Sequence, residues 1–333
     1  MNNWEPKNGN AFLVPKIKKE KLMKDQMSQL NEFKQFLMDR QKSPTTIIGY
    51  VGDIVSFSKW FAQTYTSDFS VEDLDTELAR IYKKALSDGG IHPRTINRRL
   101  ASLRAFAAWA QQTDYLPQGP NPISNVRPAR QVMLAPKWID HKERSRLLRT
   151  VDAEVKRAMI LFPRLRFQII RDAAILKMFL HTGLRVDELA NLQLTDINMD
   201  DRRGVLVVRN GKGAKRREIP LNPDARSAIQ TYLKIRPDDA GLTNLFVDMK
   251  ATKIEKRTIQ RAVARFAKLA GLQHVSCHTL RHTFAKDLID RGVTLEKVAA
   301  LLGHSNLNTT RIYTTPSSRD LEAAVNLLID DKP

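Results

Sequence analysis

Cysteine is almost absent from this chain of 333 residues, which contains only Cys277. A single cysteine excludes an internal disulfide and any zinc cluster built from cysteine ligands. No apolar run approaches the ~18 residues that a membrane helix needs. The first residues, MNNWEPKNGNAFLVPKIKKEKLM, also lack the continuous apolar stretch of a signal peptide. These absences predict a cytoplasmic protein, because a chain without disulfides suits a reducing compartment.

Acidic side chains are scarce beside basic ones. The chain has 55 Lys and Arg against 36 Asp and Glu, which gives a net charge of +19. Such an excess creates a positive field that attracts polyanions, nucleic acid above all. A basic factor of the ribosome or of a membrane surface has the same charge, so composition leaves that alternative open. The hydrophobic content of 42% and the length indicate a folded chain with room for two domains.

The first part of the chain has the apolar periodicity of helices. Apolar residues recur at helical spacing over residues 27–37. Ser43 is a suitable N-cap and Pro44 suits the first helical position, so a second helix is expected to start there. Further helices are expected over residues 74–86 and from Pro93 onward. The KIKKEK cluster that precedes them is either an arm that touches DNA or a solvated tail.

The helix that Pro93 opens carries four arginines, Arg94, Arg98, Arg99 and Arg104. No acidic residue falls between Arg94 and Ala110, so paired surface ion pairs do not account for these charges. A helix that is apolar on one side and basic on another is suited to lie against phosphates. We therefore predict that these four arginines bind DNA.

A second domain is expected after a proline-rich linker. Five prolines interrupt the periodicity between Pro117 and Pro136. Asp140 and Glu143 have the spacing of an N-cap and its reciprocal acid, so the second domain is expected to start near Trp138.

The second domain is predicted to combine helices with one strand pair. Residues 205–208 and 217–221 are expected to pair as strands across a turn at Asn210-Gly211. Helices are expected over residues 167–179, 186–192, 223–235, 258–270, 278–291 and 295–302. The predicted fold is mainly α with a small antiparallel β-sheet.

Two motifs in this domain have the residue types of phosphate chemistry. Arg185 follows a glycine turn at the start of a short helix, where the helix dipole disfavours a cation, and Glu188 lies one turn further on. A guanidinium there suits bidentate binding of phosphate, although an ordinary surface ion pair fits as well. The turn Asn210-Gly-Lys212-Gly-Ala-Lys215 lacks the spacing of a phosphate-binding P-loop. Its Lys212 has a movable proton and can protonate a leaving oxygen.

Two further motifs add histidines and a tyrosine. His278 and Arg281 share one helix face, and His282 follows them. A metal site formed by His278 and His282 is the alternative, but Arg281 would repel a dication. Gly-His304 precedes Tyr313, which lies in a polar stretch rather than an apolar one. A lone tyrosine is more often a packing or surface residue than a nucleophile, so Tyr313 by itself does not decide the chemistry.

Taken together, these motifs contain no acidic cluster suited to Mg²⁺. We therefore predict phosphoryl transfer with neither a metal nor another cofactor, in which fixed cations stabilise the extra negative charge of the transition state. A tyrosine with its ordinary pKa of about 10 needs help to attack near neutral pH. Neighbouring cations would lower that pKa, and a histidine could take the proton.

The motifs HTGLRVDEL, RNGKGAKRREIPL, HTLRHTFA and LLGHSNLNTTRIY stand in this order in the chain. On these motifs the sequence resembles the tyrosine recombinase family (phage integrase, Xer-like). The similarity spans residues 26–313, and its N-terminal part resembles the family's core-binding domain at Ser43, Thr46, Tyr50, Asp53 and Phe57.

The resemblance implies how the phosphate is bound. Arg185 and Arg281 would clamp the scissile phosphate, and His304 would occupy the second phosphate-contacting position. Glu188 resembles the acidic residue that braces this site.

The resemblance also implies which group attacks and which groups move protons. Tyr313 would be the nucleophile and would form a 3′-phosphotyrosyl intermediate, whose bond energy allows religation without ATP. Lys212 resembles the hairpin lysine that acts as general acid toward the 5′ oxygen, and Lys215 is a rival for that role. His278 matches the family's general acid/base.

The resemblance further implies a clamp around double-stranded DNA with an inverted-repeat core site. Four protomers would synapse two duplexes, and the enzyme would be associated with the nucleoid. The expected organisation is a basic tail (1–25), a helical core-binding domain (26–120), a linker (121–138), a catalytic domain (139–315) and a C-terminal helix for protomer contact (316–333). Packing of that last helix on its own domain is an equal alternative.

Two other functions remain as alternatives. One is a DNA-binding or excision factor without cleavage activity, although binding alone gives no reason for a tyrosine placed after Gly-His304. The other is a type IB topoisomerase, which shares the chemistry but relaxes DNA as a monomer without a specific site.

Overall fold

A computed structural model describes residues 16–130, 137–209, 216–237, 241–304, 306–313 and 325. The chain forms two compact units, Met1–Met133 and Leu134–Pro333. Each unit has its own hydrophobic core. No helix among the described residues is long and apolar enough to cross a membrane.

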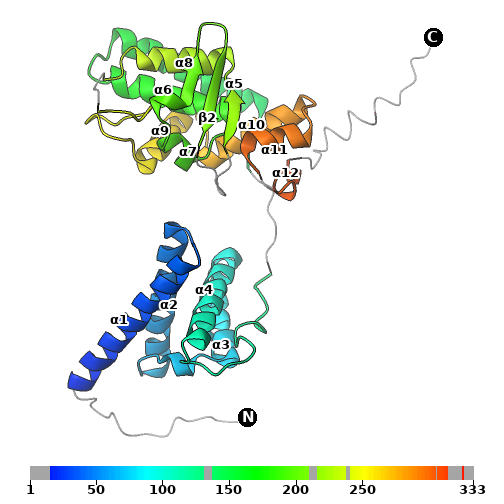
Figure 1. The fold of residues 1–333 in the computed structure, drawn as a ribbon. Coiled ribbons are helices and arrows are strands. Elements are labelled where there is room, and N and C mark those ends of the chain that lie inside the picture. The colour runs from blue at the N-terminus through cyan, green and yellow to red at the C-terminus, as the bar shows by residue number, and fades with distance from the viewer. Residues whose placement is uncertain are drawn as a thin grey trace. The chain divides into compact units, whose positions relative to one another are not determined.

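The first unit is helical, as the sequence predicts (Figure 1). Its elements are α1 (Lys16–Asp39), α2 (Pro44–Tyr65), the 3₁₀ turn η1 (Val71–Asp73), α3 (Thr76–Asp88) and α4 (Pro93–Gln112). The expected start of α2 is confirmed, because Pro44 opens the helix and the Ser43 hydroxyl accepts a hydrogen bond from the backbone N–H of Thr46. Its core is rich in aromatic rings, among them Phe57 packed edge-on against Tyr82.

The packed part of the first unit extends beyond the expected boundaries. Helix α1 begins at Lys16, inside the segment expected to be a tail. Residues 121–129 were expected in the linker, yet Ile123 and Val126 are buried in the core. The Asn97 side chain also exchanges two hydrogen bonds with the backbone of Ala129, at 2.7 and 3.0 Å. Apolar burial and this amide pairing therefore hold the proline-rich segment against α4 as far as Ala129.

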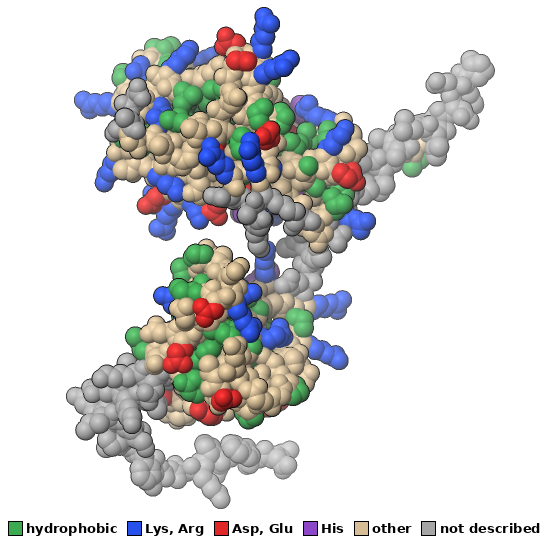
Figure 2. All heavy atoms as spheres, viewed as in Figure 1, with side chains coloured by type: hydrophobic (Ala, Val, Ile, Leu, Met, Phe, Trp, Pro, Cys, Tyr) green, Lys and Arg blue, Asp and Glu red, His purple; other side chains and the backbone are tan. Residues whose placement is uncertain are grey.

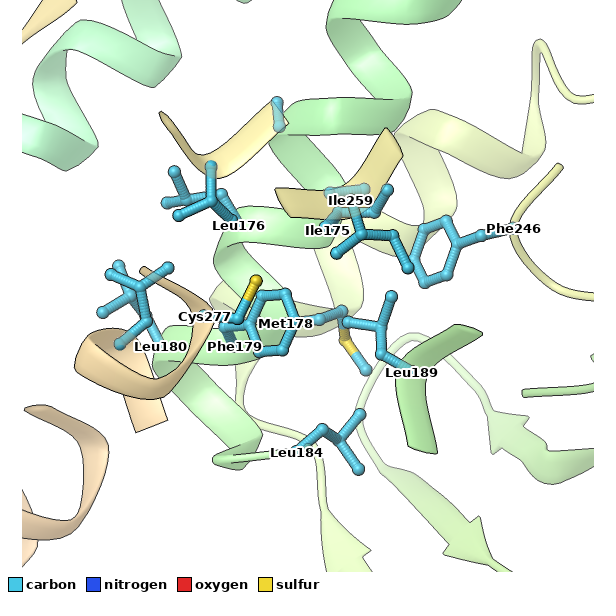
Figure 3. Close-up of a cluster of buried hydrophobic side chains, with 14 of the residues drawn as sticks. Ile175, Leu176, Met178, Phe179, Leu180, Leu184, Leu189, Phe246, Ile259 and Cys277 are labelled. Carbon is cyan, nitrogen blue, oxygen red and sulfur yellow. The ribbon is translucent and has the colours of Figure 1, made fainter. Parts of the chain in front are cut away.

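The second unit surrounds a central helix. The elements are α5 (His141–Ile160), α6 (Arg166–Thr182), α7 (Val186–Ala190), η2 (Leu194–Asp196), β1 (Ile197–Met199), β2 (Gly204–Val208), β3 (Arg217–Pro220), α8 (Pro223–Leu233), α9 (Lys256–Leu269), α10 (Cys277–Asp290), α11 (Leu295–Leu302) and α12 (Asn308–Arg311). Helix α6 is buried over nearly its whole length and packs against α5, α8, α9 and α10. Figure 3 shows its residues Ile175, Leu176, Met178 and Phe179 in the core beside Cys277.

Cys277, which matched no motif, is a core residue. Burial raises the pKa of its thiol to about 11, so the thiol stays protonated and packs as a small apolar group.

The sheet has three antiparallel strands in the order β1-β2-β3. The predicted pairing of residues 205–208 with the strand that starts at Arg217 is confirmed, with Leu206 opposite Ile219. Strand β1 was not predicted, because its three residues are too short for an alternation pattern. Residues 200–203 form the turn between β1 and β2, where the Asp200 carboxylate accepts hydrogen bonds from the backbone N–H groups of Arg202 and Arg203. The tip of the second turn, residues 210–215, lies outside the described residues.

Candidate active site

Arg281 lies on α10, and its guanidinium reaches two other segments of the second unit. Helix α10 begins after Ser276, whose hydroxyl accepts a hydrogen bond from the backbone N–H of Thr279. Arg281 is only 4% exposed. Its Nη1 donates to the carbonyl of Gly183 at 2.5 Å, and its Nη2 donates to the carbonyl of Leu302 at 2.7 Å. The guanidinium therefore joins the turn before α7 to the end of α11.

Arg185 meets Arg281 at the same carbonyl. Its Nη1 donates to the carbonyl of Leu302 at 3.4 Å, so one oxygen accepts from both arginines. Arg185 is the N-cap of α7, where its backbone N–H and its Nη1 both donate to the Glu188 carboxylate, at 2.8 and 2.9 Å. These hydrogen bonds hold the guanidinium in place. Because the Arg185 side chain remains 32% exposed, the guanidinium is also open to a ligand.

Arg217 is a third guanidinium at this site, and it was not predicted from the sequence. It stands at the start of β3 and donates to both oxygens of Glu188, at 2.9 and 2.8 Å. Its Nε donates to the carbonyl of Leu301 at 2.9 Å. The signal for this residue was strand alternation, since Arg217 shares a face with the buried Ile219. A charge on the inward face of a strand indicates a buried partner.

Gly303 allows the Arg217 contact. It ends α11 with a φ of +65°, and a Cβ there would lie 2.9 Å from Nη1 of Arg217. Both the left-handed backbone and the close approach favour glycine at this position.

The carboxylate of Glu188 is the only acid in contact with the three guanidinium groups of Arg185, Arg217 and Arg281 among the described residues. Burial acts to raise its pKa, but the hydrogen bonds from Arg217 and from the Arg185 backbone, together with both positive charges, lower it to about 2. Burial and the charge of Arg185 lower the pKa of Arg281 to about 10, so Arg281 stays protonated near neutral pH. Three cations around one anion leave the site positively charged.

The depressed pKa of Glu188 predicts a loss of stability in acid. Its pKa falls from 4.5 to about 2 on folding, so the stabilisation is complete above about pH 4.5 and is lost as pH falls toward 2. By this linkage the carboxylate contributes about 3 kcal/mol. We expect the difference in unfolding free energy between wild type and Glu188→Gln, measured by urea titration at a series of pH values, to shrink across this window. The exposed Glu296→Gln is the control, and a wild-type advantage that stays constant with pH would contradict the expectation.

Tyr313 is buried in a small apolar cluster of its own. It is 1% exposed and packs with Phe284, Ala285, Val298 and Leu302. Burial raises the pKa of its hydroxyl, and the charge of Arg281 opposes that rise. The tyrosine therefore lies beside the arginines but is not open to a ligand in this conformation.

His304 links Arg281 to the segment that carries Tyr313. Its Nε2 lies 3.0 Å from Nη2 of Arg281, and its Nδ1 lies 2.8 Å from the hydroxyl of Thr310. Burial, followed by the charges of Arg281 and Arg185, lowers the pKa of His304 to about 4. The ring is therefore neutral at pH 7, and one of its nitrogens accepts a hydrogen bond.

His278 takes no part in this hydrogen-bond network, and two other expected site residues are not among those that the structure describes. His278 is exposed and makes no side-chain hydrogen bond within the described part of the chain. Lys212 and Lys215 lie outside the described residues, as does the expected C-terminal helix apart from Val325. No group of three or more His, Cys, Asp and Glu side chains among the described residues is placed to hold a metal ion.

The arginines of α4 differ in their environments. Arg94 is exposed, and its guanidinium has no partner within residues 16–130. Arg98 forms an ion pair with Asp53 of α2, and Arg99 lies 3.9 Å from the same carboxylate. The inference that ion pairs do not account for these charges was therefore wrong for Arg98, because the acid comes from another helix. Arg104 donates to the carbonyl of Ile123 at 3.2 Å while remaining exposed.

Each of the two units matches the model of a known protein family. The phage integrase family model matches residues 137–319, and the model of the phage integrase N-terminal SAM-like domain matches residues 30–113. The tyrosine recombinase XerC of Corynebacterium glutamicum is 32% identical over 289 residues, which cover 86% of this chain and 86% of the relative. The tyrosine recombinase XerA of Thermococcus kodakarensis is 30% identical over 298 residues, which cover 89% of this chain and 93% of the relative.

Solved structures share the fold. The XerH site-specific recombinase in a post-cleavage complex with a palindromic difH substrate matches with a TM-score of 0.70 and 22% identity, over 86% of this chain and 81% of that one. A lambda integrase dimer bound to a COC′ core site matches with a TM-score of 0.66 and 18% identity, over 88% of this chain and 96% of that one. The chain therefore belongs to the phage integrase family and is a tyrosine recombinase, an enzyme that cleaves and rejoins DNA.

Proposed function

We propose that this recombinase cleaves DNA through a covalent bond between Tyr313 and a 3′ phosphate, at the site formed by Arg185, Arg281 and His304. The observation that carries the proposal is the shared carbonyl of Leu302, which accepts from both arginines. Two guanidinium groups that meet at one oxygen are close enough to bind the non-bridging oxygens of one phosphate.

The charge of the site suits the transition state of phosphoryl transfer. Negative charge grows on the non-bridging oxygens as the new bond forms, and fixed donors stabilise it most where water is excluded. Arg281 is held by carbonyls of two segments, and Glu188 holds Arg185. Because Arg217 binds both oxygens of Glu188, the carboxylate is itself fixed. Both guanidinium groups are therefore held in position before the phosphate arrives.

Attack requires a local change at Tyr313. Its hydroxyl is buried, so the side chains that cover it have to open before a phosphate can reach it. The oxygen of Tyr313 then forms a bond to phosphorus while the bond to the 5′ oxygen breaks. Lys212 gives a proton to the 5′ oxygen, with Lys215 as the rival acid, and His278 acts as acid/base on the DNA side. The phosphotyrosyl bond retains the energy for religation, so the reaction needs no ATP, and the fixed arginines take the charge-stabilising role that a metal cofactor would otherwise have.

We propose double-stranded DNA with an inverted-repeat core site as the partner, bound by a homotetramer. The XerH structure contains a palindromic substrate and the lambda integrase structure contains a dimer on a core site, which supports a symmetric assembly here. Figure 2 shows Lys and Arg side chains on the surfaces of both units, in keeping with contacts to a phosphate backbone from each. In this proposal the C-terminal segment, residues 316–333, contacts a neighbouring protomer, and the enzyme is associated with the nucleoid.

A substrate nicked near the crossover tests the proposed chemistry. Cleavage releases a short fragment that carries the 5′ hydroxyl, and without this fragment religation cannot occur, so the covalent intermediate accumulates. Protein joined to DNA through Tyr313, located by mass spectrometry of the digested adduct, supports the proposal. An adduct at another residue contradicts it. Relaxation of a plasmid without any specific site, by the monomer, would favour topoisomerase activity instead.

We expect Arg94 to contribute to DNA affinity through a phosphate. Its guanidinium is exposed and unpartnered within the described residues, so Arg94→Ala should weaken binding to all sequences and reduce the slope of log affinity against log salt by about 1. Electrophoretic mobility shifts at several salt concentrations measure both effects. Arg80→Ala on α3 is the control, because Arg80 already pairs with Glu77. Equal effects of the two substitutions would remove the reason to assign Arg94 to DNA.

A further inference from the structure

The hydroxyl of Tyr313 has a partner that was not predicted from the sequence. It lies 2.5 Å from Nδ1 of His282, and the two ring centroids are 5.5 Å apart. His282 follows Arg281 on α10. The same helix therefore carries one arginine of the proposed phosphate clamp and the histidine that contacts the nucleophile. The motif spacing had indicated His282 only as a rival metal ligand with His278.

The direction of this hydrogen bond follows from burial. The Tyr313 side chain is 1% exposed, so the proton of its hydroxyl needs an acceptor inside the protein. Within the described residues the only hydrogen-bond partner of that hydroxyl is His282. We therefore assign Tyr313 as the donor and Nδ1 of His282 as the acceptor, which leaves the ring proton on Nε2.

His282 is neutral in this environment. Burial, followed by the charges of His278 and Arg281 on its own helix, lowers its pKa to about 4. Among the described residues after α11, the titratable groups Tyr313 and His304 face it. A DNA phosphate entering the site would bring negative charge and raise the pKa of His282 back toward neutrality, where a general base is most effective.

We propose, resting on the function proposed above, that His282 is a catalytic residue that accepts the proton of the Tyr313 hydroxyl during attack. As the oxygen of Tyr313 bonds to phosphorus, its O–H bond breaks and the proton passes to Nδ1 of His282. The 5′ oxygen leaves with the electron pair of the broken P–O bond and takes a proton from the acid on its own side. On religation the two protons return, so each cycle ends with neutral His282 and protonated Tyr313.

His278 is placed for a different task. Its ring centroid lies 6.5 Å from that of His282, and it is exposed, without a side-chain hydrogen bond in the described part of the chain. An exposed imidazole is open to DNA, whereas His282 is turned toward the buried nucleophile. In this proposal His278 therefore acts on the DNA phosphate, and His282 acts on the hydroxyl of Tyr313.

The test is the pH dependence of single-turnover cleavage on the nicked substrate for wild type and His282→Gln. The glutamine oxygen can accept the hydrogen bond from Tyr313 but cannot take its proton. We expect His282→Gln to cleave about 10²-fold more slowly at pH 7. Its rate should rise about tenfold per pH unit, because the tyrosine must then ionise unaided, whereas the wild-type rate should level off above the near-neutral pKa of His282 and change little between about pH 7 and 9. A variant that is slower by the same factor at every pH, or not slower at all, would overturn the proposal.

A second variant covers the case in which His282→Gln folds poorly. His282→Ala leaves a space beside the hydroxyl, and added imidazole should restore cleavage in proportion to its neutral form. If imidazole has no effect on a folded His282→Ala, the proposal is wrong.

Failure of this inference can be told apart from failure of the proposed function. Tyr313→Phe reports on the nucleophile alone: an adduct in that variant contradicts the proposed function whatever His282 does. If Tyr313→Phe is inactive while His282→Gln keeps the wild-type pH profile, only the role of His282 is withdrawn.

Discussion

Tyr313→Phe is expected to bind DNA with wild-type affinity and to form no covalent adduct with the nicked substrate. The substitution removes the only atom proposed to bond to phosphorus and leaves the apolar cluster around the ring unchanged. The one hydrogen bond lost is the contact with His282, and its loss costs about 1 kcal/mol of stability. Denaturing gels with labelled DNA detect the adduct, and thermal unfolding checks the fold.

Tyr232→Phe is the matched control for this experiment. Tyr232 is also fully buried in the second unit, and its hydroxyl accepts one hydrogen bond, from the backbone N–H of Val247 at 3.2 Å. It should therefore lose similar stability and keep cleavage. Adduct formation by Tyr313→Phe would mean that another residue is the nucleophile.

Arg281→Lys is expected to slow cleavage by about 10²- to 10³-fold at saturating DNA. A lysine ammonium keeps the positive charge but concentrates it on one nitrogen, without the planar set of donors of a guanidinium. It cannot bond the carbonyls of Gly183 and Leu302 and still present a flat fork to a phosphate. We expect the effect in the rate of adduct formation rather than in DNA affinity, because the charge is retained.

Arg261→Lys is the control for that substitution, since Arg261 is exposed on α9 and the charge is again retained. Arg281 is buried, so the melting temperature of each variant has to be measured beside its activity. A folded Arg281→Lys that cleaves at the wild-type rate would rule out Arg281 as half of the phosphate clamp.

Several features of the fold could be predicted because they depend on neighbours along the chain. The starts of α2 and α5 could be predicted from their capping residues, because a cap satisfies backbone N–H groups within one turn. These residues are Ser43 and Pro44 for α2, and Asp140 and Glu143 for α5. The pairing of β2 with β3 followed from two β-branched or alternating segments on either side of a turn. The extent of the first unit could not be predicted, since prolines indicate a break in helix but not whether Ile123 is buried.

The candidate site was predicted as a set of residue types and was only partly predicted as a set of contacts. Arg185 and Glu188 are three residues apart, so their contact could be predicted from helix geometry. Arg217 was overlooked because its acid, Glu188, lies in another element. The partner of Tyr313 was open for the same reason, since either histidine of α10 could have faced it.

The sequence by itself determined the family, the order of the motifs, the helices and the positive charge, because these depend on local chemistry and composition. Only the tertiary structure decided that Asp53 neutralises part of the basic helix, that Arg217 fixes Glu188, and that His282 rather than His278 contacts Tyr313. The physical reason is that each of these contacts joins segments far apart in the chain. Which side chains meet is then set by how helices and strands pack, and that packing cannot be read from the spacing of residues.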